Sequence, residues 1–346
     1  MGSEPERPAP PAQARREARL LSVVAPVHNE QETIREFHRR VIAVLGDRPM
    51  ELVVVDDGST DSTAAILAEI AAEDPRVRVV ELSRNFGHQT ALTAGLDHAR
   101  GDVVAMLDAD LQDPPETIPQ MLESWREGAD VVYAVRRRRS GETRFKLATA
   151  RGFYRVFGAL TQLGAEADAG DFRLLDRRAV DALLSMRERN RYLRGMTIWI
   201  GFTQAAVPYE RDARAAGATK YTLRRMVRFS LDAISSFSNA PLQLATVLGF
   251  VFSGLAFLAI PVIVILKLLG SYLPGFSTVT IVVLLLGGIQ LIAIGIIGEY
   301  VGRIYDEVKG RPLYLVRATR NIDPLPDADD GPAEIRGRAG VGDASP

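Results

Sequence analysis

The sequence predicts an α/β fold, a doubly wound and mostly parallel sheet, followed by an apolar membrane segment. Two observations support this fold class. Between residues 20 and 221, short apolar runs alternate with segments of helical periodicity, which is the pattern of strands and crossover helices in a parallel sheet. After about residue 240, long stretches carry no charged residue, although the mean hydropathy of the whole chain is close to zero.

The elements of the sheet follow from local patterns. Runs rich in aliphatic and β-branched residues predict buried strands, and the segments between them show helical spacing. The first helix is acidic at its start, and Asp61 or Ser62 can cap the second. In chain order, the expected strands and helices are Leu21–Ala25, Glu30–Leu45, Leu52–Val55, Ser62–Glu73, Val77–Leu82, His88–His98, Val103–Leu107, Pro115–Glu127 and Val131–Val135.

Composition sets the expected domain boundaries. Residues 1–19 are rich in Pro, Ala, Arg and Glu and are predicted to be disordered, and a folded domain is expected at 20–221. In 222–240, apolar residues recur at helical spacing with arginines largely off that stripe, which predicts an amphipathic helix in the membrane interface. An ordinary surface helix is the alternative. The segment 302–346 follows the membrane region and is expected to be disordered after about residue 325.

Two spans are long and apolar enough to form a membrane hairpin at 241–301. Leu242–Leu266 and Val279–Gly298 carry no charge, and at about 1.5 Å per residue each crosses a hydrocarbon core of roughly 30 Å. Two buried helices of a soluble core are the alternative, but these would normally keep polar residues on one face. Pro261 lies inside the first span, where membrane helices tolerate it better than soluble ones. Assembly of the hairpins into a homo-oligomer is left open by the sequence.

Flanking charges predict the orientation of the hairpin. The connecting turn, Lys267–Phe276, carries only Lys267, whereas basic residues precede the first span and follow the second. By the positive-inside rule, both termini and the folded domain are expected in the cytoplasm, with the chain as a multi-pass protein of the cell (inner) membrane. The flanking basic residues are Arg224, Arg225, Arg228, Arg303, Lys309, Arg311, Arg317 and Arg320.

Composition also excludes several classes of protein. A net charge of −1 over 346 residues argues against a nucleic-acid-binding protein, for which a strong basic excess is expected. The chain has no cysteine, so it contains neither disulfides nor thiolate metal sites. The four histidines show no spacing typical of a zinc site.

The run Asp108-Ala109-Asp110-Leu111-Gln112 follows the expected strand Val103–Leu107 directly. Residues two apart in an extended segment project to the same side, so Asp108 and Asp110 present two carboxylates at the carboxyl end of a strand, where open parallel sheets bind ligands. Mg²⁺ or Mn²⁺ favours such oxygen ligands, and Gln112 adds an amide oxygen. A bare D-x-D is a weak signal, but the buried-type strand before it and Pro114-Pro115 after it favour a site.

Two other strand ends carry polar groups that would surround the same crevice. The first strand leads into Pro26-Val27-His28-Asn29-Glu30, and the second leads into Asp56-Asp57-Gly58-Ser59. Such acidic and amide side chains suit the base and ribose of a nucleotide. No glycine-rich loop follows the first strand, which excludes a Rossmann dinucleotide fingerprint and a Walker loop.

With these motifs, the chain resembles the inverting GT-A glycosyltransferases. More closely, it resembles the membrane-bound polyprenyl-phosphate glycosyltransferases, relatives of dolichyl-phosphate mannose synthase and bactoprenol glucosyltransferase. The resemblance covers roughly residues 20–317, and His28 stands where the family usually has an aromatic residue. The matching stretches are PVHNE at 26–30, VVDDGSTD at 54–61, LSRNFGHQTALTAGLDHARGD at 82–102, DADLQDPPE at 108–116, DAGDFRLLDRRAVDAL at 168–183, RNRYLRG at 189–195, VPYERDARAAGATKY at 207–221 and GEYVGRIYDEVKGRPLY at 298–314.

The resemblance implies a metal-dependent transfer of a sugar from a nucleotide-diphosphate sugar to polyprenyl phosphate of the undecaprenyl or decaprenyl type, for cell-envelope glycans. It implies that Mg²⁺ or Mn²⁺ is held by Asp110 and Gln112. Asp108 and Ala109 would lie at the ribose and diphosphate, and Arg214 and Lys220 would bind donor phosphate, although surface charge is the simpler reading of that basic pair. The remaining nucleotide contacts would come from Pro26, His28, Glu30 and Asp56.

The acceptor phosphate needs cations, and a basic cluster follows the fifth expected strand. We expect Arg136 to bind the lipid phosphate, with Lys146 and Arg151 behind it, although an ordinary solvated loop is the default for such a run. Besides Asp108, the candidate catalytic carboxylate is Asp171, which would position the sugar or assist attack. A simple turn or helix-start role explains Asp171 equally well.

Two other functions are compatible with the nucleotide motifs. A processive polysaccharide synthase would share the fold, but such enzymes carry a Gln-x-x-Arg-Trp signature and more membrane spans, whereas this chain has Arg191-Tyr192-Leu193-Arg194 and one hairpin. A non-catalytic nucleotide-sugar-binding membrane scaffold would need no metal and would bind without turnover.

Overall fold

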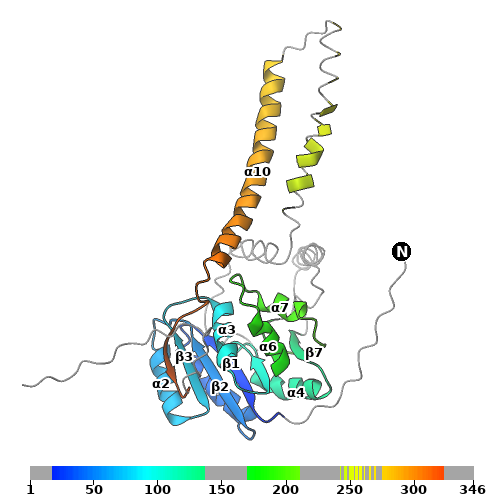
Figure 1. Ribbon diagram of the computed structural model, residues 1–346. Helices are drawn as coiled ribbons and strands as arrows, with labels where there is room; N and C mark the ends of the chain where they lie inside the picture. The colour runs from blue at the N-terminus through cyan, green and yellow to red at the C-terminus, as the bar shows by residue number, and fades with distance from the viewer. Residues whose placement is uncertain are drawn as a thin grey trace, which may run out of the picture. The chain divides into compact units, whose positions relative to one another are not determined.

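The computed structural model describes residues 18–136, 170–210 and 275–322, with scattered positions between 242 and 269 (Figure 1). Its described residues fall into two compact units: 18–136, 170–210 and 311–322 form the first, and the apolar helical positions up to 310 form the second. Several predicted segments lie wholly or largely outside the described residues: 1–17, the interface helix at 222–240, the first membrane span and the C-terminal tail.

The first unit is built on one eight-stranded sheet with the order β7-β5-β6-β4-β1-β2-β3-β8. Neighbouring strands are parallel in the pairs β1–β2, β1–β4, β2–β3 and β5–β7, and antiparallel where β6 or β8 takes part. The strands are β1 (Leu21–Val27), β2 (Met50–Asp56), β3 (Val77–Leu82), β4 (Val103–Met106), β5 (Val131–Arg136), β6 (Arg173–Asp176), β7 (Gln204–Tyr209) and β8 (Val316–Arg320).

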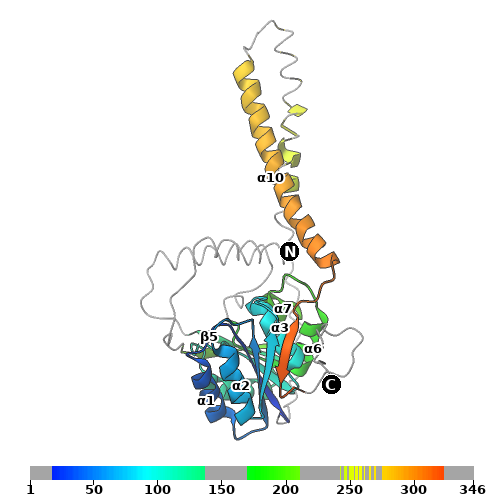
Figure 2. The same cartoon turned by 90° about the vertical axis from the view of Figure 1, so that its left-hand side faces the viewer.

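Helices cover both faces of this sheet. The apolar side chains of α1, α2 and α4 join the odd-numbered residues of β1 in one core, while α3 packs on the other face of β1 and β2, next to α6 (Figure 2). The bounds are α1 (Ile34–Leu45), α2 (Thr63–Glu73), α3 (His88–His98), the 3-10 turn η1 (Pro115–Thr117), α4 (Ile118–Arg126), α6 (Arg177–Ser185) and α7 (Leu193–Trp199).

The five expected strands and four expected helices are present, with ends that differ by a few residues. The α/β class with a mostly parallel centre is therefore confirmed, but the sheet is mixed. β6 runs antiparallel between β4 and β5, and the sequence analysis predicted none of β6, β7 and β8. Ser62 is the N-cap residue of the second helix and makes no side-chain cap hydrogen bond with the described residues. Asp61, just before it, accepts a hydrogen bond at Oδ1 from the backbone N–H of Thr63 at 2.9 Å.

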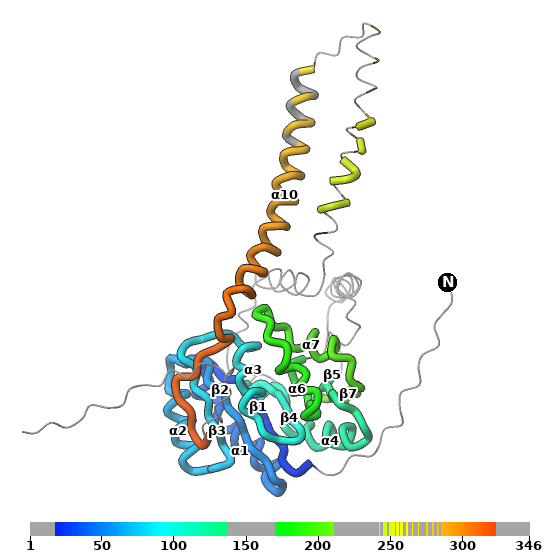
Figure 3. The backbone as a smooth tube through the Cα atoms, in the orientation of Figure 1, coloured from blue at the N-terminus to red at the C-terminus, as the bar shows by residue number. Residues whose placement is uncertain are grey.

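The chain returns to the sheet after its apolar helix. β8 pairs antiparallel with β3 at the edge of the sheet (Figure 3). Just before it, Tyr314 is buried and donates a hydrogen bond to Oδ2 of Asp97 at 2.8 Å, and Arg187 pairs with the same carboxylate at 2.8 Å. These contacts attach the segment that follows the apolar helix to α3 and β3.

The second unit contains α10 (Phe276–Val308), a continuous helix of 33 residues. Within it, Leu285–Val308 is long and apolar enough to cross a membrane, and it is the one such helix among the described residues. The predicted second span, Val279–Gly298, therefore lies inside a longer helix. The part of this helix that is long and apolar enough to cross a membrane begins and ends closer to the C-terminus than predicted. The partner helix of the predicted hairpin is not shown by the described positions.

Close approach of α3 to the sheet depends on Gly95. A Cβ atom added at Gly95 would lie 2.2 Å from Cγ1 of Val24 on β1 and 3.2 Å from Cγ2 of Val55 on β2. Both valines are fully buried and β-branched, so they cannot rotate away at low cost. The helix axis is thus held nearer to the strands than any other residue at position 95 would allow.

Replacing Gly95 by alanine should therefore destabilise the protein despite the higher helix propensity of alanine. Overpacking of this kind typically costs about 1–3 kcal/mol, and we expect a lower denaturation temperature with the apolar helix unaffected. Gly295→Ala is the matched control, because Gly295 lies in α10 with nothing within 4 Å of an added Cβ. Thermal unfolding of both variants in detergent tests this, and equal stability of the two would contradict the close-approach argument.

Candidate functional site

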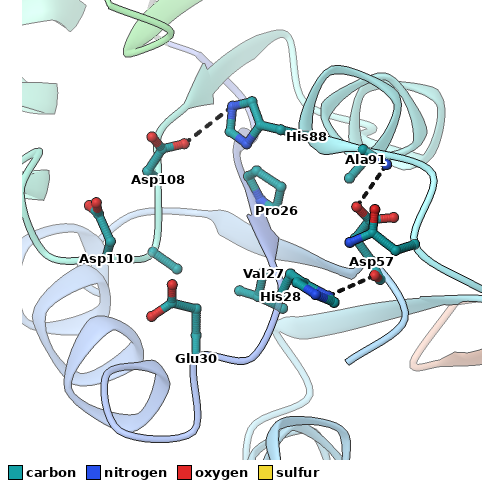
Figure 4. Close-up of a pocket in the computed structure, with 12 residues that line it drawn as sticks. Pro26, Val27, His28, Glu30, Asp57, His88, Ala91, Asp108 and Asp110 are labelled. Atoms are coloured by element: carbon teal, nitrogen blue, oxygen red, sulfur yellow. Dashed lines mark hydrogen bonds and ion pairs between the residues drawn. The ribbon is translucent and has the colours of Figure 1, made fainter. Parts of the chain in front are cut away.

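A cavity of about 310 Å³ opens at the carboxyl ends of β1, β2 and β4. Parallel pairing brings these ends to one edge of the sheet, with Val27 of β1 opposite Asp56 of β2. Figure 4 shows the side chains around it. The lining residues are Pro26, Val27, His28, Glu30, Asp57, Asn85, Gly87, His88, Ala91, Asp108, Ala109 and Asp110.

The structure brings together six of the residues that the sequence analysis proposed for this site. Pro26, His28 and Glu30 come from the end of β1, and Asp108, Ala109 and Asp110 follow β4. Two of the turns are backbone-strained, because Asn29 (φ 58°) and Leu111 (φ 62°) adopt the left-handed conformation. Each directly adjoins a pocket carboxylate, Glu30 or Asp110. Such conformations cost of the order of 1–3 kcal/mol and persist where the surroundings impose them.

At the end of β2, Asp57 lines the cavity and Asp56 does not. Asp56 is fully buried, and its Oδ1 accepts a hydrogen bond from the backbone N–H of Ser59 at 3.0 Å. Its Oδ2 has no hydrogen-bond partner within the described part of the chain. The sequence analysis assigned Asp56 rather than Asp57 to the nucleotide. The structure points the Asp56 side chain into the protein and its neighbour toward the cavity, because successive residues of a strand face opposite sides.

Asp57 fixes the loop that enters α3. Its Oδ1 and Oδ2 accept hydrogen bonds from the backbone N–H groups of Phe86 (2.7 Å) and Gly87 (2.9 Å). Nδ1 of His28 lies 3.0 Å from the carbonyl oxygen of Asp57, and since a carbonyl only accepts, this ring nitrogen carries the proton. Burial raises the pKa of Asp57 above its ordinary value, although the two backbone hydrogen bonds oppose this shift.

A row of alternating charges runs along one wall of the cavity. Nε2 of His88 lies 3.5 Å from Oδ1 of Asp108 and 3.3 Å from Oδ2 of Asp171. Arg194 of α7 donates two hydrogen bonds to the same carboxylate, from Nε to Oδ1 of Asp171 at 2.7 Å and from Nη2 to Oδ2 at 3.2 Å. Gln89 also donates to Oδ2 of Asp171, at 3.3 Å. Asp171 is therefore a largely buried carboxylate that three side chains of the described residues hold, and it lies beside the cavity rather than on its lining.

Proximity of these groups shifts their pKa values. Burial lowers the pKa of His88, but the hydrogen bond to Asp171 and the charge of Asp108 outweigh burial and raise it to about 9. Burial raises the pKa of Asp108 to about 6, with His88 opposing the shift. Burial also raises the pKa of Asp171, but His88 and Arg194 overcome this and hold it well below its ordinary range. At neutral pH the imidazole is an imidazolium, and Asp171 is a weak base.

Asp110 presents a carboxylate to the cavity, and Gln112 supports it from behind. The backbone N–H and the Nε2 of Gln112 donate to Oδ1 (3.1 Å) and Oδ2 (2.8 Å) of Asp110. Gln112 is buried and does not line the cavity. The described part of the chain holds no group of three or more His, Cys, Asp or Glu that could bind a metal. The donor set fits Mg²⁺ or Mn²⁺, since such ions take one or two carboxylates and complete their shell with water and substrate phosphate.

Arg136 ends β5 outside the cavity lining. Its Nε donates to the hydroxyl of Tyr209 at 3.1 Å, and this hydroxyl donates to Oδ1 of Asp113 at 2.5 Å. A Cβ added at Gly170 would lie 3.6 Å from Nη2 of Arg136, so the guanidinium reaches the stretch that carries Asp171. The other proposed cations, Lys146, Arg151, Arg214 and Lys220, lie outside the described residues.

The sequence analysis missed Asp57, Asn85 and His88 as lining residues. All three lie in stretches that it quoted, VVDDGSTD and LSRNFGHQTALTAG, but no local pattern indicates which side chain faces the cavity. The one available signal was the position of His88, which follows directly after a glycine at the predicted start of a helix behind a strand.

Comparisons with known proteins agree with this arrangement. The sequence profile of the family described as Glycosyl transferase family 2 matches residues 22–184. An uncharacterized glycosyltransferase, YkcC, of Bacillus subtilis (strain 168) is 47% identical over 87% of this chain and 94% of its own. A prophage-derived bactoprenol glucosyl transferase of Shigella flexneri is 40% identical over 88% of this chain and 99% of its own.

One solved structure is similar at a low level. The crystal structure of glucosyl-3-phosphoglycerate synthase from Mycobacterium tuberculosis, in complex with Mn²⁺, uridine diphosphate and phosphoglyceric acid, is 24% identical, covers 62% of this chain and 76% of that chain, and has a TM-score of 0.46. A likeness of this size supports no argument about the present chain. The two relatives above match over almost their whole length. Together with the family profile, they show that this glycosyltransferase belongs to glycosyl transferase family 2.

Proposed function

We propose that the protein transfers a sugar from a nucleotide-diphosphate sugar to a polyprenyl phosphate at the cell (inner) membrane, giving a lipid-linked monosaccharide. The observation that carries this proposal is the joint presence of the carboxylate-lined cavity and an apolar helix long enough to cross a membrane. Relatives named bactoprenol glucosyl transferase, about 40% identical over nearly their whole length, support a lipid acceptor.

The donor is proposed to occupy the cavity. His28, Asp57 and Glu30 at the ends of β1 and β2 suit the base and ribose, since their side chains offer both donors and acceptors of hydrogen bonds. Asp108 and Asp110 follow β4, and the diphosphate would lie beside them. Arg214 and Lys220 are proposed to bind the same diphosphate, as the family resemblance implies.

Asp110 would hold a divalent cation, which when bound supplies positive charge to the leaving diphosphate. Gln112 orients Asp110 through its two hydrogen bonds, and it would become a ligand itself if its amide turned the oxygen outward. The chain supplies few ligands here, so the cation and the donor diphosphate are expected to bind together.

The acceptor needs no strong general base. A phosphate is already an anion at neutral pH, whereas an alcohol acceptor would have to lose a proton. The properties of Asp171 fit a reaction without a general base, because its lowered pKa makes it a poor base and its hydrogen-bond partners hold it in place. We therefore propose that Asp171 positions groups at the sugar side of the cavity, and that arginine side chains offset the repulsion between two anionic substrates.

Asp110→Asn should abolish almost all sugar transfer while the fold survives. The change keeps the size of the side chain but removes the charge that a divalent cation needs, and removing Mg²⁺ and Mn²⁺ from the wild type with a chelator should have the same effect. The measurement is transfer of radiolabelled sugar from a panel of nucleotide sugars into a lipid extractable by organic solvent. Full activity in excess chelator would exclude the metal, and no transfer by the wild type from any donor would refute the proposed function.

Arg136→Ala should reduce transfer strongly while leaving donor affinity within a few-fold. Guanidinium forms bidentate hydrogen bonds with phosphate, and loss of such a charged contact of about 2–3 kcal/mol corresponds to roughly 30- to 150-fold. Lys146→Ala and Arg151→Ala should act in the same direction but more weakly. Donor binding by calorimetry and transfer rates at varied polyprenyl phosphate provide the test. Collapse of donor binding with intact acceptor affinity would place Arg136 at the diphosphate instead.

The proposed topology puts both termini and the catalytic unit in the cytoplasm, with two membrane helices joined by a turn near Ser271. Because the chain has no cysteine, a single introduced cysteine reports its side of the membrane. Ser271→Cys should react with an impermeant reagent applied to intact cells, and Ser140→Cys should react only after lysis. The reverse pattern would place the active site away from cytoplasmic nucleotide sugars.

A further inference from the structure

His88 is the only described cation within ion-pair distance of the Asp108 carboxylate. In Figure 4 its ring extends from the start of α3 toward Asp108 across the wall of the cavity. Oδ1 of Asp108 accepts no hydrogen bond from any described residue, so its stabilisation there comes from the charge of His88 at 3.5 Å. The other charged groups that act most on Asp108 are carboxylates, namely Asp110, Asp113 and Asp171, and all of them repel it.

Asp171 is much less dependent on His88. Arg194 binds both of its oxygens, and Gln89 donates to Oδ2 while accepting from the backbone N–H of Leu193 at 2.9 Å. Loss of the imidazole would therefore leave Asp171 paired and in place. Asp108 would lose the one described cation within ion-pair distance, and Asp110, Asp113 and Asp171 would still repel it. Arg194 would remain as a cation that acts on Asp108 from farther away. The two ion pairs of His88 thus have different effects. The contact with Asp171 fixes the position of the imidazole ring, and the contact with Asp108 places the positive charge of the ring beside that carboxylate.

We propose that His88 is a positioning residue of the transfer reaction, whose imidazolium, anchored by Asp171, holds the Asp108 carboxylate toward the bound donor and supplies positive charge at the cavity wall. The inference rests on the proposed function, because sugar transfer provides its readout. The raised pKa of His88 agrees with a ring that stays charged across the neutral range. His88 lies beside Asp108 and away from His28 at the other side of the cavity, so its effect should fall on the reacting groups rather than on nucleotide affinity.

The test compares three variants of the full-length protein in detergent with polyprenyl phosphate. His88→Gln keeps a hydrogen-bond donor but removes the charge, and His88→Lys restores a cation. The lysine has room, because the His88 side chain is 41% exposed. His38→Gln is the matched control: Nε2 of His38 also lies 3.3 Å from a carboxylate, Asp74, but on α1 outside the cavity lining.

We expect His88→Gln to lower kcat about 30-fold, equivalent to about 2 kcal/mol, and His88→Lys to recover most of that loss. His38→Gln should retain wild-type kcat. Calorimetry should give the same affinity of all variants for the nucleoside diphosphate, within about threefold, since that is under 1 kcal/mol. Thermal unfolding checks that each variant is folded. If His88→Gln is too unstable to assay, His88→Lys decides, since an active lysine variant supports the inference and a folded but inactive one opposes it.

Three results would overturn the inference. These are a wild-type kcat in His88→Gln, equal inactivity of folded Gln and Lys variants, and a loss of nucleoside diphosphate affinity that matches the loss of kcat. The last would make His88 a nucleotide contact. If the wild type transfers sugar and His88→Gln is equally active, only the role of His88 is refuted. A wild type that transfers no sugar from any donor refutes the proposed function itself.

Discussion

The docking of α3 against the first two strands is the constraint on which the site depends. Gly95 allows the helix to approach Val24 more closely than any side chain would permit, and Asp57 holds the backbone N–H groups at the helix entrance. The hydrogen bonds to Asp57 fix where the helix begins, with His88 and Gln89 as its first two residues, and Gly95 sets how close the helix lies to the sheet. Both side chains contact Asp171, so these contacts depend on where the helix lies. Packing in the core thus determines the electrostatics of the cavity.

The cavity concentrates carboxylates although its proposed substrates are anions. The negative charge of Asp108 is repelled by three neighbouring carboxylates, those of Asp110, Asp113 and Asp171. Within the described chain, His88 and Arg194 provide compensating positive charge beside Asp108 and Asp171. This arrangement leaves Asp110 facing the cavity, and among the described residues only Gln112 donates to it. An uncompensated carboxylate beside a diphosphate is unfavourable without a cation between them, which is the physical reason for proposing a metal there.

The chain that follows α10 is attached to the sheet of the first unit. After α10 ends at Val308, Tyr314 is buried against Asp97 near the end of α3, and β8 adds a strand beside β3. β3 leads directly into the loop held by Asp57, so the segment that leaves the apolar helix and the loop that enters the site are attached to the same strand. The segment 311–322 is thus part of the fold of the first unit, which the sequence analysis did not predict.

The sequence by itself determined the alternation of strands and helices, the apolar segment and the Asp108–Asp110 motif, because each depends on the period or composition of neighbouring residues. It also indicated that the ends of β1, β2 and β4 meet, since parallel strands share one edge. It did not determine that β6 and β8 run antiparallel, that Asp57 rather than Asp56 faces the cavity, or that His88 bridges Asp108 and Asp171. Those facts depend on pairing between residues 20 to 241 positions apart, on strand phase and on the depth at which α3 packs. Only the tertiary structure decided them, because contact between distant segments leaves no periodic signal in a single sequence.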